Sequence, residues 1–61
     1  MEWKERVKAL RRSVGMTMED FAGEIGVTLN TIWKWESGYS TPSRLARRRI
    51  EEFEGKLKKG A

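Results

Sequence analysis

The stretch MEDFAGEIGVTLNTIWKWES, residues 18–37, decides the fold of this chain. It predicts two short helices joined at a glycine, with apolar residues only where two crossed helices must touch. The inward-facing residues are Phe21, Ala22 and Ile25 on the first helix, and Ile32 and Trp35 on the second. Gly26 supplies the tight corner, and Val27 packs beneath it. A unit of this kind holds a short helix away from the body of a small domain.

Helical spacing continues on both sides of this stretch. Its apolar positions are Trp3, Val7, Leu10 and Val14 before it, and Ala46, Ile50, Phe53 and Leu57 after it. They predict one helix over about residues 2–13, ended by Gly15, and a last helix that Ser43 caps. Thr17 and Thr28 are the expected caps of the two central helices, and Gly38 is the expected end of the second. We expect the tail, residues 55–61, to be frayed, and residues 1–61 to form a single compact all-α domain of four to five helices.

Size and composition exclude several classes of function. With 61 residues, no Cys and no His, the chain has neither thiolate ligands nor the commonest general base and zinc ligand. We therefore expect no enzyme, no metal and no cofactor. No apolar run approaches the roughly 20 residues of a membrane span, so we also expect no membrane partner and a cytoplasmic location.

The positive charge is concentrated near the C-terminus. Residues 1–40 carry six basic and six acidic side chains, whereas residues 41–61 carry seven and three. This asymmetry favours a polyanionic partner approached from one side, or else a solvated helix face. Arg47, Arg48 and Arg49 cannot all face one duplex, because successive helical residues turn by roughly 100°. We expect Arg47 and Arg48 to pair with the glutamates four residues later, at positions 51 and 52.

The register LRRSVGMTMEDFAGEIGVTLNTIWKWESGYSTPS resembles the Xre/Cro-type helix-turn-helix domain of phage repressors, a lambda-repressor-like fold. The resemblance covers about residues 5–53 and combines Gly-Met-Thr at 15–17, Ile-Gly-Val at 25–27 and Thr-Pro-Ser at 41–43. It implies double-stranded DNA binding through the major groove, a homodimer on DNA, and a small transcriptional regulator that acts as a repressor. Residues 41–50 are also similar to short Xre-type antitoxins, so a toxin partner is the alternative.

The resemblance further implies a structural ion pair between Arg11 and Glu36. Beside Trp35 and Gly38, an unpaired Glu36 carboxylate would lose much of its hydration. The alternative is that both residues are ordinary surface charges.

Four residues on the outward side of the second central helix are the candidates for reading bases: Leu29, Asn30, Trp33 and Lys34. The amide of Asn30 suits an adenine edge, Lys34 a guanine edge or a phosphate, and Leu29 a thymine methyl. Relatives often carry Gln at the positions of Met18, Leu29 and Asn30, so their base preferences do not transfer. Trp33 either faces DNA, or it folds back over the last helix or completes the core.

Phosphate contacts are expected on both flanks of that helix. The candidates are Thr17, the first helical amides from Met18 onward, Thr28, Thr31, Ser37, Tyr39, Ser40, Ser43 and Arg44. Each is alternatively a cap or turn residue only. A third function class is membrane-surface binding by the basic end of the chain, but the core already requires part of its apolar face.

Overall fold

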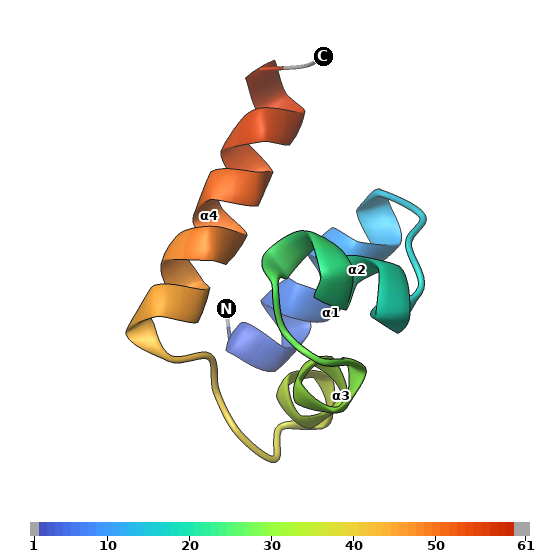
Figure 1. The fold of residues 1–61 in the computed structure, drawn as a ribbon, viewed down its shortest axis with the longest axis vertical. Helices are drawn as coiled ribbons and strands as arrows, with labels where there is room; N and C mark the ends of the chain where they lie inside the picture. Colours follow the sequence, from blue (N-terminus) through green and yellow to red (C-terminus); the bar gives the residue numbers. More distant parts are fainter. Residues whose placement is uncertain (1, 60–61) are drawn as a thin grey trace.

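The computed structural model describes the backbone of residues 2–59 and the side chains of residues 2–57. It contains four helices: α1 (Trp3–Ser13), α2 (Met18–Ile25), α3 (Leu29–Ser37) and α4 (Arg44–Lys59). In Figure 1, α3 is seen nearly end-on at the lower edge, below α2, and α4 runs along the left side. The all-α prediction is confirmed, and α1, α2 and α3 begin and end within one residue of their predicted bounds.

The core lies where the four helices meet. Its buried residues are Val7, Leu10, Phe21, Ala22, Ile25, Ile32, Trp35, Ala46 and Ile50. Helix α3 packs against both α1 and α2, and α4 packs against α2. Phe53 extends this core, because its ring meets Phe21 edge-on with the two centroids 5.7 Å apart. The orientation of α3 is therefore set by two helices at once.

The corner between α2 and α3 needs a glycine. Gly26 has a φ of +89°, and the amides of Gly26 and Val27 both donate to the Ala22 carbonyl. A side chain here would also approach the Arg49 guanidinium, since an added Cβ would lie 2.8 Å from its Nη1 atom. The α2–α3 corner is thus fixed by backbone conformation and by a contact from α4.

The sequence-based expectation of a frayed tail covers residues 55–61. Helix α4 continues through Gly55 to Lys59, while residues 60 and 61 lie outside the described part of the chain. Glycine weakens a helix interior by about 1 kcal/mol, but it ends a helix only by taking a positive φ, which Gly55 does not. Arg6 also holds this part of α4, because its Nη2 donates to Glu54 Oε1 at 2.6 Å.

Among the side chains of residues 2–57, the expected arginine–glutamate pairs within α4 do not form. The Arg47 guanidinium instead lies 5.4 Å from the Trp3 ring centroid, and Arg6 lies 4.5 Å from the same ring. Glu51 faces Arg6 at 3.8 Å. These contacts join the start of α1 to α4. The rule that pairs charges four residues apart applies within one helix, so it does not predict contacts between helices.

Within residues 2–59, we find no helix with both the length and the apolar character to cross a bilayer.

Candidate nucleic-acid interface

Helix α3 is capped at both ends. At its start, Thr28 Oγ1 accepts a hydrogen bond from the Thr31 amide at 3.3 Å. At its end, Gly38 takes a φ of +81°, and the Tyr39 amide donates to the Lys34 carbonyl at 2.9 Å. Such caps each stabilise a helix end by about 1 kcal/mol. They give a nine-residue helix a defined first and last turn.

The inward face of α3 ends in an ion pair. Arg11 Nε donates to Glu36 Oε2 at 2.6 Å, and Arg11 Nη2 donates to Glu36 Oε1 at 3.0 Å. The hydrogen bond to Glu36 raises the pKa of Arg11, outweighing the opposing effect of burial. Arg11 Nη1 also donates to the Met16 carbonyl at 3.1 Å. One side chain of α1 therefore fixes both the end of α3 and the loop that leads into α2.

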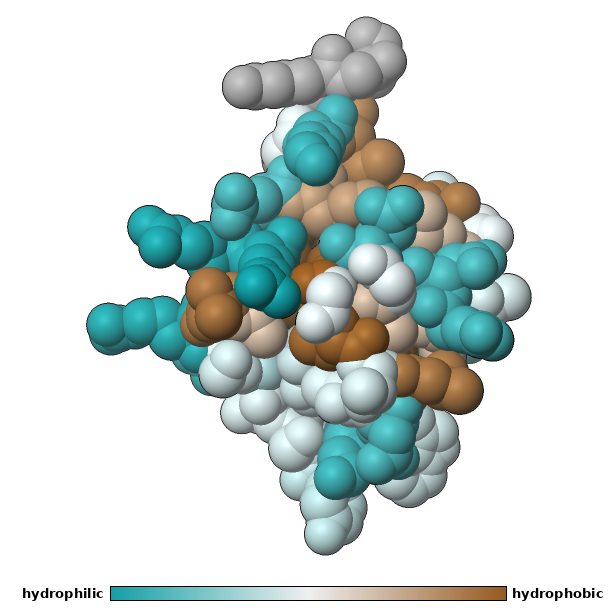
Figure 2. All heavy atoms as spheres, in the orientation of Figure 1, coloured by the Kyte–Doolittle hydropathy of each residue, from teal (hydrophilic) through white to brown (hydrophobic). Residues whose placement is uncertain are grey.

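The outward face of α3 carries the four candidate base-reading residues. Leu29, Asn30 and Trp33 are exposed, and Lys34 is half-exposed with its Nζ atom 5.8 Å from the Tyr39 ring centroid. Trp33 neither covers α4 nor joins the core, so the alternative in which it folds back is wrong. Figure 2 shows that the lower end of the molecule, over α3 and the loop after it, is mostly pale. Side chains of intermediate hydropathy therefore cover most of this end, which does not present charge alone.

One flank of α3 meets the start of α2 and the middle of α1. Lys8, Met18, Trp33, Glu36 and Ser37 line a shallow hollow there. Thr17 caps α2 by accepting from the Asp20 amide at 3.1 Å, so its own O–H can still donate outward. The α2 N-terminus, whose dipole favours an anion, thus lies beside a lysine that sequence reasoning did not select. Lys8 directly follows Val7, which is buried. That position next to a core residue is the sequence signal that could have indicated which side of α1 carries Lys8.

The other flank is formed by the loop between α3 and α4 and the first turn of α4. Tyr39, Ser40 and Arg44 are exposed. Ser43 Oγ accepts from the Ala46 amide at 3.3 Å, which makes Ser43 the cap of α4 and leaves its O–H free to donate. Donor groups therefore stand on both sides of α3.

A family model described as helix-turn-helix matches residues 7–52, which is most of the chain. The chain belongs to the Xre/Cro-like helix-turn-helix family. It is a domain for double-stranded DNA binding and transcription regulation. Comparisons with curated proteins and with solved structures gave no match.

Two of the O–H groups suggested for phosphate contacts already donate within this Xre/Cro-type domain, one from the Thr28–Thr31 pair and one from Ser37. Thr28 and Thr31 bond to each other through their Oγ1 atoms at 2.9 Å, so only one of the two O–H groups can donate outward. Ser37 Oγ donates to the Lys34 carbonyl at 3.1 Å. A phosphate needs donors, so Ser37 would have to break that bond in order to contribute.

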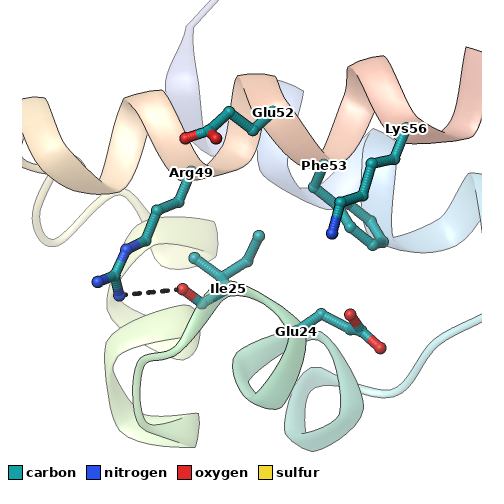
Figure 3. Close-up of a pocket in the computed structure, with 6 residues that line it drawn as sticks. All are labelled: Glu24, Ile25, Arg49, Glu52, Phe53 and Lys56. Atoms are coloured by element: carbon teal, nitrogen blue, oxygen red, sulfur yellow. Dashed lines mark hydrogen bonds between the residues drawn. The ribbon is translucent and has the colours of Figure 1, made fainter.

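A second groove of the Xre/Cro-type domain lies between the end of α2 and α4 (Figure 3). Its lining residues are Glu24, Ile25, Arg49, Glu52, Phe53 and Lys56. Arg49 Nη1 donates to the Ile25 carbonyl at 3.3 Å, which satisfies an acceptor at the end of α2. Two acidic and two basic side chains balance in this groove, so it lacks the donor excess that a phosphate backbone requires.

Proposed function

We propose that this domain is a cytoplasmic transcriptional repressor that binds specific double-stranded DNA sites as a homodimer, with α3 in the major groove. The observation that carries the proposal is the outward face of α3. Leu29, Asn30 and Trp33 stand exposed there, with Lys34 half-exposed beside them. The opposite face, with Ile32, Trp35 and the Glu36 carboxylate, is buried.

Base reading falls to the polar pair on this face. The Asn30 amide has one donor group and one acceptor, which match N7 and N6 of adenine. Lys34 stands four residues further along, so both side chains lie on the same side of the helix. We propose that Asn30 reads an adenine, and that Lys34 reads a guanine edge or binds a phosphate.

Phosphate binding falls to donors on either flank. On the α2 side they are the Thr17 hydroxyl, the amides beginning at Met18, and Lys8. On the α4 side they are the loop at Tyr39 and Ser40, the Ser43 hydroxyl and Arg44. The remaining O–H of the Thr28–Thr31 pair lies at the start of α3 itself. Contacts on two flanks fix the helix in the groove, whereas contacts on one flank leave it free to roll.

The dimensions of the domain support the proposed dimer. Half-sites for such motifs are spaced by roughly 34–36 Å along the duplex. The domain measures 32 × 22 × 21 Å and contains one reading helix, so a second copy is needed to reach the next half-site. Two copies related by a two-fold axis recognise a site with the same symmetry. Repression then requires only that the dimer occupy promoter DNA.

Selection of bound duplexes from a random DNA library tests this proposal. We expect enrichment of a two-fold symmetric site, bound by two copies, with an affinity that falls steeply as salt rises. Titration of the winning duplex by fluorescence anisotropy at 50 and 200 mM salt measures that fall. The absence of any enriched site, or an affinity that does not change with salt, would contradict the proposal.

An antitoxin role is the second candidate, and a feature of α4 favours it. Leu45 is exposed on α4 between Arg44 and Arg48. An apolar residue framed by cations suits an acidic protein partner. Co-expression with the protein encoded beside this one, followed by size-exclusion chromatography, tests the idea. Loss of a stable complex on Leu45→Glu, with DNA binding retained, would support it, and no complex with the wild-type domain would refute it.

A further inference from the structure

Two of the large exposed apolar side chains lie on the helix proposed to read DNA. Leu29 retains 48% of its accessible surface and Trp33 retains 52%. They are four residues apart on α3, so they lie side by side along the helix, about 6 Å apart in rise. We call this pair the apolar ridge. Exposed surface of this kind marks a contact site more often than it serves stability.

The ridge has a defined position. The Thr28 cap fixes the turn that carries Leu29, and Trp33 borders the hollow that Met18 also lines. Helix α3 itself is held by its buried face and by the Arg11–Glu36 pair. The ridge therefore runs along the α2 flank of α3, parallel to the polar pair Asn30 and Lys34.

The chemistry of the major groove selects the partner of this ridge. Base edges there present hydrogen-bond donors and acceptors, and the apolar group among them is the C5-methyl of thymine. A polar edge covered by Leu29 or by the carbon face of the Trp33 ring would lose its hydration without gaining a hydrogen bond. The methyl group has no hydrogen bonds to water to lose, and its burial removes apolar surface from water.

We infer that the domain recognises thymine methyl groups through the apolar ridge, at two positions per half-site that lie within about two base-pair steps of each other. The limit follows because the two side chains are separated by a rise of about 6 Å along the helix, which spans at most about two steps of 3.4 Å along the DNA. The inference rests on the proposed DNA binding and adds the class of base edge that this chain reads.

Uracil provides the test, because it keeps every hydrogen-bonding group of thymine and lacks only the methyl. Two libraries are prepared, one with thymine and one with uracil, and each is selected for binding. The site selected from the thymine library is then synthesised as a duplex, and single thymines in it are replaced by uracil. We expect a loss in affinity of about fourfold at each of the two read positions, the value for burying one methyl-sized group, and no change at thymines outside the site.

Protein variants assign the effect to the ridge. Leu29→Ala and Trp33→Ala change exposed side chains, so both should fold, and circular dichroism verifies this before binding is measured. Each should remove the thymine preference at one position and leave the other intact. Asn30→Ala is the matched control on the polar side, and it should weaken binding without changing the thymine-to-uracil ratio.

The outcomes separate the two proposals. A selected site that binds equally well with uracil throughout overturns the methyl inference and leaves DNA binding standing. The same holds if the ratio persists in both ridge variants. No selected site from either library would overturn the proposed function, and the inference with it.

Discussion

Replacing Glu36 by glutamine should destabilise the domain strongly, because it leaves the Arg11 guanidinium without its counter-charge. The Glu36 side chain is 3% exposed and that of Arg11 is 17% exposed. Removing one partner of a buried pair costs about 3–5 kcal/mol. We expect about 3 kcal/mol, the lower end of this range, because Arg11 keeps some access to water.

This loss is large for a domain of this size. At about 0.05–0.15 kcal/mol per residue, the whole free energy of unfolding is roughly 3–9 kcal/mol. Urea unfolding followed by tryptophan fluorescence measures the change. With a slope of about 1 kcal/mol per M, the midpoint should fall by about 3 M, and a domain at the lower end of this stability range would then unfold in little or no urea. Glu52→Gln makes the same chemical change on the exposed face of α4, and it should stay within about 0.5 kcal/mol of the wild type.

The double variant Arg11→Met with Glu36→Leu separates burial of a lone charge from loss of shape. Replacing both charges by apolar groups is often neutral, although the bond from Arg11 to the Met16 carbonyl is also lost, at about 1 kcal/mol. We expect the double variant to recover to within about 1 kcal/mol of the wild type. An unchanged midpoint for Glu36→Gln, or a double variant no more stable than the single one, would refute the reasoning.

Three further predictions concern stability and can be measured by the same urea titration. Gly26→Ala should cost about 1–2 kcal/mol, because alanine must take a left-handed φ and its Cβ would displace Arg49; an unchanged midpoint would contradict this. Gly23→Ala and Gly55→Ala, at helical glycines with open space around the added Cβ, should instead stabilise by about 0.4–1 kcal/mol, and a loss at either would show an unrecognised constraint. Thr28→Ala should cost about 1 kcal/mol by removing the α3 cap, and Thr28→Ser should restore most of it, unless the hydroxyl has no capping role.

The sequence was sufficient for the frame that holds α3. The helical spacing of Phe21, Ile25, Ile32 and Trp35 predicted the crossing of α2 and α3, because such apolar residues have few other places to go in a small domain. Residues with a local role were equally readable. Thr28 acts within one turn of its own position, so its role does not depend on the rest of the fold.

The parts that sequence reasoning missed depend on contacts between distant segments. Gly55 continues the helix in a segment where Arg6, 48 residues before Glu54, bonds to α4. Arg47 turns to the Trp3 ring instead of the glutamate one turn away, and nothing within α4 indicates that choice. Lys8 joins the candidate interface only because α1 packs against α3. Each depends on the tertiary arrangement, which single-helix rules do not contain.

The outward face of α3 is proposed to read bases. The most direct measurement is the base preference at every position of the selected site, determined in parallel for the wild-type domain and for Asn30→Ala. We predict that the variant loses the preference at one position in each half-site and keeps the others, because an amide reads a single base edge. Identical preference profiles for the two proteins would contradict the claim, and so would equal weakening at every position.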